Sequence, residues 1–485
     1  MWEHIFKMHP FLHMLFSNKF IRSVSTLSVG TFVSQVLMVI IAPLLTRLYA
    51  PSDIGLFSLY ATLLSVLSVL SGLRYQLAIP LPETNQEAIE VVRLSVIGVL
   101  IISLLTSITI HYGIEISLLL NTPQLSEFLW VLPVGVFFTG TYQVFSNWAI
   151  RIKAFRAIAI TNILQTVVII IIQVLGYRIG AFSLILGSLL GQIIAVIYLC
   201  VKSLPNKAFS DWSLKQIWVL AKRYRYFPYF STWSALINAA GAQLPLLLIA
   251  SFFSINSAGL YALANRVVAS PIPIIGDAIG KVFFANASEK RLDGTLGNMT
   301  FRVFKILCTI GLPPTFALII GGPFIFVSIF GEEWRQAGEF ASLMAPWMFF
   351  VFTVSPLSTL FLVLERQGVE LILQLIFISA RIIAIMVGVW LNNLNIGVML
   401  FSYTSAIYWF LILVWVMISV NVSLIDVVKE IGKTSILGFL CTIPLLLLLD
   451  FKPLHDYWIA FILISFFLIL IMYGMLIKKV KNGNI

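Results

Sequence analysis

Two opposite charges lie inside one apolar stretch of the chain. Residues 259–289 are apolar enough to cross a bilayer, yet they contain Arg266 and Asp277. A charged side chain near the bilayer centre costs about 2.5–3.5 kcal/mol, so such residues usually face a polar cavity or an opposite charge. In a continuous helix, this spacing would place both side chains on the same side. The pair therefore predicts either a functional polar site or an ion pair that joins neighbouring helices.

Two prolines separate these charges. Pro271 and Pro273 remove backbone donors in the middle of the predicted helix. Proline in a helix interior kinks or breaks the helix, which membrane proteins tolerate where other groups satisfy the freed carbonyls. The sequence therefore predicts an interrupted and functional helix over 259–284.

Two more arginines fall inside apolar runs. Arg74 lies near the inner end of the second run, and Arg381 lies near the middle of the eleventh. Three arginines against the single carboxylate of Asp277 predict a cationic interior and an anionic substrate, because the guanidinium fork binds two phosphate oxygens at once. Three other roles stay open: Arg74 extending to the membrane surface, Arg381 binding helix carbonyls, and Asp277 carrying a coupling ion.

Amide and aromatic side chains accompany the arginines. Amides in membrane helices bind hydroxyl groups or join helices by hydrogen bonds. The sequence predicts sugar contacts at the following positions: Gln35, Tyr75, Gln76, Asn238 and Gln243, together with the indoles of Trp148 and Trp233.

A series of membrane helices must position these groups. The 485 residues are 60% hydrophobic and only 11% charged, against roughly 25% charged residues in soluble domains. The mean hydropathy is +1.01. Runs of the length that spans a bilayer recur along the chain, which predicts an all-α polytopic membrane protein with about 14 transmembrane helices. The runs are 24–46, 54–79, 94–112, 128–150, 157–176, 180–201, 228–253, 259–284, 303–330, 339–364, 370–390, 396–420, 435–449 and 457–477.

The basic residues are distributed unevenly between the two sides. With a cytosolic N-terminus, 24 of the 31 lysines and arginines fall in inner segments, four fall in outer segments, and three lie in the spans. Inner loops of membrane proteins carry such an excess of positive charge. The pattern predicts that both termini are cytosolic, and it attributes the net charge of +11 to topology rather than to nucleic-acid binding.

Residues for enzymatic or metal chemistry are not clustered in the sequence. Cys200, Cys308 and Cys441 are isolated and lack the paired spacing of metal or redox sites. The connections between the spans are too short for a soluble catalytic domain. We therefore expect a non-enzymatic protein without a metal or cofactor.

A weak internal repeat links the two halves. An offset of 204 residues aligns 44–60 with 248–264, so that Gly55 matches Gly259. A second pairing places the segment before Pro133 over the segment before Pro346. Since the offset equals six spans, it predicts two parallel six-helix repeats around a central cavity, followed by two extra helices.

The repeat divides the chain into five predicted segments. They are an N-terminal cytosolic or interfacial segment (1–23), an N-terminal six-helix bundle (24–201), a cytosolic linker (202–227), a C-terminal six-helix bundle (228–420) and two extra helices with a cytosolic tail (421–485).

Four stretches resemble a known family. They are IGLFSLY at 54–60, LRYQLAIPLPE at 73–83, GLYALANRVVASPIPIIGDAIGKVFF at 259–284 and IFGEEWRQAGEFASLMAP at 329–346. These stretches are similar to bacterial Wzx-type oligosaccharide flippases of the multidrug/oligosaccharidyl-lipid/polysaccharide exporter superfamily. Members of that family often carry an acidic residue where this chain has Gln76, so the resemblance brings no ion-coupling role to this position.

The resemblance implies a transport function. It implies a two-bundle fold in the bacterial inner membrane that moves undecaprenyl-pyrophosphate-linked oligosaccharides for O-antigen, capsule or exopolysaccharide synthesis. It also implies a cationic cavity, which Arg74, Arg266 and Arg381 match by type and region. We expect membrane lipids, a polysaccharide polymerase, a chain-length regulator and a proton or sodium gradient as partners. The alternatives are a multidrug or cation antiporter of the same superfamily and a membrane polysaccharide polymerase or ligase.

Overall fold

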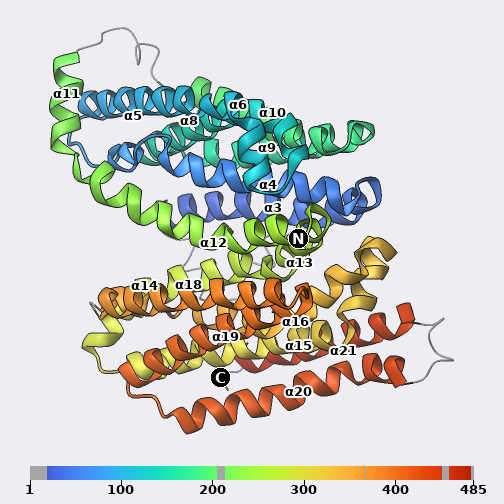
Figure 1. Ribbon diagram of the computed structural model, residues 1–485. Coiled ribbons are helices and arrows are strands. Elements are labelled where there is room, and N and C mark those ends of the chain that lie inside the picture. The colour runs from blue at the N-terminus through green and yellow to red at the C-terminus, as the bar shows by residue number, and fades with distance from the viewer. Residues whose placement is uncertain (1–18, 205–213, 365, 451–457, 482–485) are drawn as a thin grey trace, which may run out of the picture. The chain divides into compact units, whose positions relative to one another are not determined.

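The chain is built from helices. A computed structural model describes residues 19–204, 214–364, 366–450 and 458–481, and every regular element in these ranges is helical (Figure 1). Eleven helices in the described ranges are long and apolar enough to cross a membrane. The predicted all-α membrane fold is confirmed, while the count of 14 spans stays a prediction.

The chain divides into two compact units, residues 1–259 and residues 260–485. The division falls inside α13 (Ile255–Ala269). The other helices of the first unit are α3 (Lys19–Leu48), α4 (Pro51–Leu70), η1 (Tyr75–Ala78), α5 (Asn85–Thr106), α6 (Ile108–His111), α7 (Gly113–Leu119), η2 (Pro123–Val131), α8 (Leu132–Arg151), α9 (Phe155–Leu175), η3 (Tyr177–Ile179), α10 (Ala181–Ser203), α11 (Leu214–Arg223), η4 (Phe227–Ser231) and α12 (Thr232–Phe252).

Long helices lie side by side in the first unit. The closest neighbours are α9 with α10, α3 with α9, and α5 with α8. Polar groups also join the helices: the Tyr49 hydroxyl donates to the carbonyl of Gln173 at 2.5 Å and lies 2.7 Å from Ser183 Oγ. The first unit is therefore held by apolar packing and by interhelical hydrogen bonds, as membrane bundles commonly are.

The second unit has its own core. Phe304 and Cys308 of α15 pack there with Ile412 of α19, Phe283 of α14 and Phe361 of α17. The helices of this unit after α13 are η5 (Ile272–Gly276), α14 (Asp277–Leu292), α15 (Leu296–Phe330), η6 (Glu332–Trp334), α16 (Arg335–Val354), α17 (Leu360–Val363), α18 (Gln367–Trp390), α19 (Leu394–Ser419), α20 (Leu424–Asp450) and α21 (Trp458–Lys481).

Several predicted spans differ from the helices that form, and three of them show how. The second run ends as an α-helix at Leu70, and residues 75–78 form a short 3₁₀ helix instead. The eighth run is interrupted by the π-helix η5, as Pro271 and Pro273 predicted. The ninth run begins earlier, at Leu296, and continues through three prolines to Phe330.

A reciprocal glycine contact matches the internal repeat. A Cβ on Gly55 would overlap the carbonyl oxygen of Ile255, and a Cβ on Gly259 would overlap the carbonyl oxygen of Pro51. The offset of 204 residues relates Pro51 to Ile255 and Gly55 to Gly259. Only glycine permits this close approach of α4 to the first turn of α13.

The predicted segment boundaries are not tested by these helices. Most of the N-terminal segment 1–23 lies outside the described residues, as does the middle of the linker 202–227. The five-segment division stays a prediction.

Candidate functional site

The segment around Arg74 interrupts a membrane helix. After α4 ends at Leu70, Leu73 and Arg74 adopt left-handed backbone conformations with φ of 47° and 61°. Residues other than glycine rarely occupy this region, and each instance costs on the order of 1 kcal/mol. The surrounding structure must therefore hold this segment in place.

Side chains of neighbouring helices hold the segment that follows. The Tyr75 hydroxyl donates to the carbonyl of Ala221 in α11 at 3.2 Å. The Gln76 amide donates to Oε1 of Gln143 in α8 at 3.0 Å. These contacts join η1 to two other helices of the first unit.

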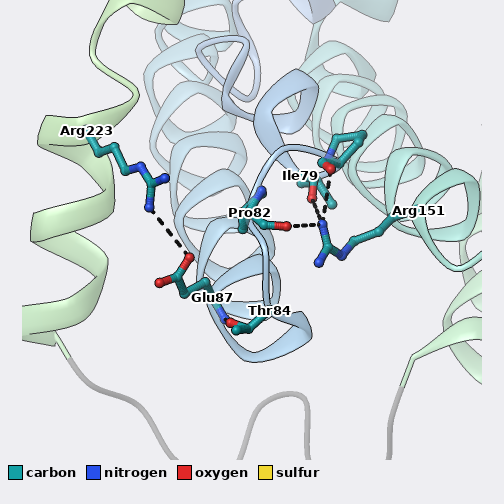
Figure 2. A network of polar contacts seen from close by, with 7 residues as sticks. Ile79, Pro82, Thr84, Glu87, Arg151 and Arg223 are labelled. Atoms are coloured by element: carbon teal, nitrogen blue, oxygen red, sulfur yellow. Dashed lines mark hydrogen bonds and ion pairs between the residues drawn. The ribbon is translucent and has the colours of Figure 1, made fainter.

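Arg151 fixes the turn between η1 and α5. Its Nη1 donates to the carbonyls of Ile79, Pro80 and Pro82 at 3.2, 3.1 and 2.8 Å. Figure 2 shows the guanidinium directed at this turn, with Glu87 and Arg223 paired on its other side. These three backbone carbonyls accept no hydrogen bond within a helix, and the guanidinium of Arg151 supplies their donors. Arg151 therefore stabilises the turn and does not bind a substrate.

Arg74 itself carries an unsatisfied donor. Its Nε is buried and has no hydrogen-bond partner among the described residues. A buried donor without a partner costs about 1–3 kcal/mol, and more when the group is charged. An anion would supply the missing acceptor.

Arg381 shows the same feature in the second unit. It lies on α18, and its guanidinium carbon is 4.9 Å from the ring centroid of Tyr408 on α19. The Nε of Arg381 is buried and lacks a hydrogen-bond partner in the described part of the chain. The ring of Tyr408 thus contacts the guanidinium of Arg381, and the Nε donor remains for another acceptor.

Arg266 is placed differently. It lies near the C-terminal end of α13, and its side chain is exposed. A charged side chain exposed on a membrane helix is favoured only where water or a polar group reaches it. None of Arg74, Arg266 and Arg381 forms an ion pair with the carboxylates whose positions the structure describes.

Asp277 begins α14 directly after η5. The π-helix η5 lies between Arg266 and Asp277 along the chain. The side chain of Asp277 lies outside the described residues. Its role as an ion pair or ion-coupling group stays a prediction.

The predicted sugar-contact residues fall into two groups. Asn238 and Trp233 of α12 are exposed, Trp233 by 60%. Gln35 is half-buried, as is Gln243, which accepts a hydrogen bond from Thr62 at 3.3 Å. The exposed pair can contact a ligand without rearrangement.

The other group is buried. Tyr75 and Gln76 are only 8% and 1% exposed, and both are used in the helix contacts described above. Trp148 is 2% exposed and donates through Nε1 to the carbonyl of Ser203 at 2.8 Å. In this structure these three side chains are used in contacts between helices, and their contact with a sugar stays a prediction.

A buried ion pair that was not predicted from the sequence lies on α5. Glu90 and Arg93, one turn apart on α5, are joined at 2.5 Å and are each 4% exposed. Their opposite charges three residues apart were the available signal. Arg93 was assigned to an inner loop because the predicted span began one residue later, whereas α5 begins at Asn85.

A large apolar cavity lies within the second unit. Its volume is about 750 Å³. Its walls come from α13, η5, α15, α16, α20 and α21, and they include Ile272, Pro314, Met348 and Phe466. A cavity lined in this way suits a hydrocarbon chain rather than a sugar.

Known proteins show the same sequence pattern. The family described as polysaccharide biosynthesis protein matches residues 44–339, more than half of the chain. The succinoglycan biosynthesis transport protein ExoT of Rhizobium meliloti (strain 1021) is 22% identical over 312 residues, which cover 62% of this chain and 61% of that protein. The teichuronic acid biosynthesis protein TuaB of Bacillus subtilis (strain 168) is 25% identical over 125 residues, 26% of each chain. The matches thus span less than two thirds of these relatives.

Solved structures show the same fold. The lipid II flippase MurJ in an inward closed conformation gives a TM-score of 0.74 at 17% identity, over 94% of this chain and 99% of that one. An inward-facing multidrug resistance transporter of the MATE family gives 0.57 at 15% identity, over 81% and 93%. The predicted relationship to polysaccharide exporters is confirmed: the chain belongs to the polysaccharide biosynthesis protein family and has the helical fold found in MurJ and MATE transporters.

Proposed function

We propose that this protein is a flippase. It moves undecaprenyl-pyrophosphate-linked oligosaccharide repeat units across the bacterial inner membrane by alternating access, for the assembly of a surface polysaccharide. It acts as a transporter and not as an enzyme. Family membership and the names of the relatives, a succinoglycan transport protein and a teichuronic acid biosynthesis protein, support this substrate class.

The unsatisfied arginine donors carry the proposal. Arg74 and Arg381 each keep a buried Nε without a hydrogen-bond partner among the described residues. Pyrophosphate presents several charged acceptor oxygens, and hydrogen bonds between charged groups contribute about 1.5–3 kcal/mol each. We assign Arg74, Arg266 and Arg381 to the binding of these oxygens.

The apolar cavity fits the lipid part of the same substrate. Its lining from α13, η5, α15, α16, α20 and α21 contains few polar atoms, and its volume is about 750 Å³. At about 0.8 kcal/mol for each buried methylene group, part of a polyprenyl chain in this cavity would be held firmly. We assign the cavity to a segment of that chain.

Hydroxyl-binding groups complete the proposed substrate contacts. Asn238 and Trp233 are exposed on α12, and Gln35 and Gln243 are half-buried. Amides donate and accept hydrogen bonds with hydroxyl groups, while an indole ring offers a flat apolar face. We assign these four residues to the binding of the oligosaccharide.

Two further assignments belong to this proposal. Asp277 forms an ion pair or couples transport to a proton or sodium gradient. Both termini of the chain lie in the cytosol.

The other predicted functions have less support. A cation antiporter would be expected to carry several carboxylates in its spans, whereas the three arginines here outnumber Asp277, and Glu90 of α5 is buried in an ion pair with Arg93. A polymerase or ligase needs a site for sugar chemistry outside the spans, and the connections that the structure describes are short. In the proposed function a polymerase and a chain-length regulator act after this protein.

Complementation tests the proposal in cells. A flippase-deficient strain that makes the cognate repeat unit would receive the wild-type chain, Arg266→Ala or Arg266→Lys, and Arg178→Ala would serve as the control because Arg178 is exposed at the short helix η3. We expect loss of surface polysaccharide and accumulation of inner-leaflet lipid-linked units with Arg266→Ala, partial rescue with Arg266→Lys, and normal export with the control. Normal export by both Arg266 variants at wild-type membrane levels would refute the assignment of Arg266.

A further inference from the structure

Helix α11 lies across the end of a membrane helix. Figure 1 shows α11 at the N-terminal end of α5 and nearly perpendicular to it. Its Ile217 and Leu220 are buried, and Leu220 belongs to the same core as Val91 and Val92 of α5. A helix that crosses the end of a transmembrane helix in this way runs parallel to the membrane surface.

Two polar contacts fix α11 in this orientation. Arg223 pairs with Glu87 in the first turn of α5 at 3.6 Å, as Figure 2 shows. The carbonyl of Ala221 accepts the hydrogen bond from Tyr75 at 3.2 Å. The side chains on the other face of α11 are therefore exposed because of the fold, and not because the helix is detached.

That other face combines cations with an indole. Lys215, Trp218 and Lys222 lie three and four residues apart, so they form one stripe along the helix, and all three are exposed. Trp218 is 67% exposed, and the Lys222 ammonium lies 5.7 Å from its ring centroid. Within the described residues, neither lysine is paired with a carboxylate.

Basic and aromatic residues continue beyond the helix. Arg225 lies 5.5 Å above the ring of Tyr226, which is 62% exposed. Tryptophan and tyrosine are enriched where membrane and water meet, because their rings are apolar and carry one polar group. Lysine and arginine near an anionic membrane surface gain about 1 kcal/mol each.

We propose that the stripe of Lys215, Trp218 and Lys222 binds the anionic phospholipid headgroups of the surrounding bilayer. The lysines contact lipid phosphates, and the indole lies at the level of the glycerol groups. The excess of basic residues at this end of the helices places the contact at the cytosolic leaflet. The charge and chemistry of the stripe fit a lipid surface, and this inference does not depend on the transported substrate.

Lipid binding to the full-length protein tests this inference. Phosphatidylglycerol and phosphatidylcholine would be titrated separately into the purified protein in detergent, and bound lipids would be counted by native mass spectrometry. We expect Lys215→Gln with Lys222→Gln to weaken phosphatidylglycerol binding by about fivefold for each lysine, with little effect on phosphatidylcholine. Trp218→Ala should weaken the binding of both lipids.

The chain offers a matched control. Lys429 and Lys433 of α20 are also exposed and one turn apart, but they lie beside Asp426 and Glu430 and not beside an indole. Lys429→Gln with Lys433→Gln removes the same charge and should change phosphatidylglycerol binding less. Equal effects of the two double variants would refute a specific contact at α11. Displacement of phosphatidylglycerol by inorganic phosphate alone would also refute it, because it would indicate a small-anion site.

A second measurement locates the stripe. Val219, next to Trp218, is 55% exposed and can carry a spin label as Val219→Cys after replacement of Cys200, Cys308 and Cys441. In vesicles that contain phosphatidylglycerol, we expect the label to be less accessible to a water-soluble relaxation agent than a label at Gly432 of α20. Equal accessibility at the two positions would contradict a membrane-bound α11.

Discussion

The second helix of each predicted repeat is interrupted, but the two interruptions are held in different ways. In the first unit, α4 ends at Leu70 and η1 follows two left-handed residues. In the second unit, η5 replaces the end of α13 and runs directly into α14. Gly72 and Gly276 lie at these two breaks, and the offset of 204 residues relates them.

The contacts around the two breaks differ in number and reach. In the first unit, Arg151 binds three carbonyls of the following turn, and Tyr75 and Gln76 bind two other helices. In the second unit, no hydrogen bond from another helix reaches η5 among the described residues, and the first such contact after it is made at the far end of α14, where Arg291 donates to the carbonyl of Val363 at 2.6 Å. We expect the first break to be a fixed anchor and the second to be the easier to move. Unsupported backbone opens first in local fluctuations.

The largest expected effect concerns the glycine contact that the two interrupted helices share. Gly55→Val and Gly259→Val would each push a side chain into a backbone carbonyl, so each should destabilise the fold by on the order of 3 kcal/mol. Gly432→Val is the control, because a Cβ there meets nothing within 4 Å. Thermal unfolding in detergent measures the loss of stability in each variant. If only one of the two glycine variants lost stability, the contact would not be reciprocal.

Replacing Arg151 or Arg291 by alanine compares how much each arginine stabilises its own unit. Arg151→Ala frees three carbonyls and should cost about 2–3 kcal/mol, whereas Arg291→Ala frees one and should cost about 1 kcal/mol. Hydrogen–deuterium exchange of the full-length protein should rise most over residues 75–84 in the first variant. A larger increase in exchange around Arg291 and Val363 in the Arg291→Ala variant would contradict this comparison, because it would show that the second unit depends more on its arginine contact.

A smaller effect is expected for the amide pair beside η1. Gln76→Leu leaves the Gln143 amide without its partner and should cost about 1–2 kcal/mol. Gln76→Leu combined with Gln143→Leu should cost less than the sum of the single changes, by about 1 kcal/mol. Additive changes in unfolding free energy would show that the pair does not support the break.

The smallest effect is expected for the surface ion pair that connects α11 to α5. Arg223 and Glu87 are 53% and 45% exposed at a separation of 3.6 Å. Exposed pairs contribute about 0.2–1 kcal/mol and weaken with salt. Arg223→Gln should therefore lower the unfolding temperature slightly at low salt and not at high salt. A large loss at both salt concentrations would show that the pair is structurally essential.

Sequence patterns predicted the features that depend on local chemistry. Apolar run length predicted the membrane helices, and Pro271 and Pro273 predicted the break in the eighth run. The end of α4 at Leu70 was not predicted, because the left-handed residues of its break are Leu73 and Arg74, and the adjacent Gly72 is no clear signal since glycine is common in membrane helices. Tertiary contacts with other helices hold these residues, and a single sequence does not show such contacts.

The candidate site was predictable only in part. The arginines stand out because charges are rare in apolar runs, and two of them do keep unsatisfied buried donors. Which aromatic and amide side chains are accessible depends on helix rotation and packing. Trp148 shows this, because its indole donates to the carbonyl of Ser203, a contact that the sequence does not indicate.

The central claim is that arginines of this protein bind the pyrophosphate of a lipid-linked substrate. The most direct measurement compares the affinity of the purified full-length protein for undecaprenyl pyrophosphate and for undecaprenol. We predict that the wild type binds the pyrophosphate form at least about tenfold more tightly, since one charge-assisted hydrogen bond contributes about 1.5 kcal/mol. Replacing Arg74, Arg266 and Arg381 together by alanine should remove this preference while leaving undecaprenol binding unchanged. Equal affinity of the wild type for both lipids, or an unchanged preference in the triple variant, would contradict the claim.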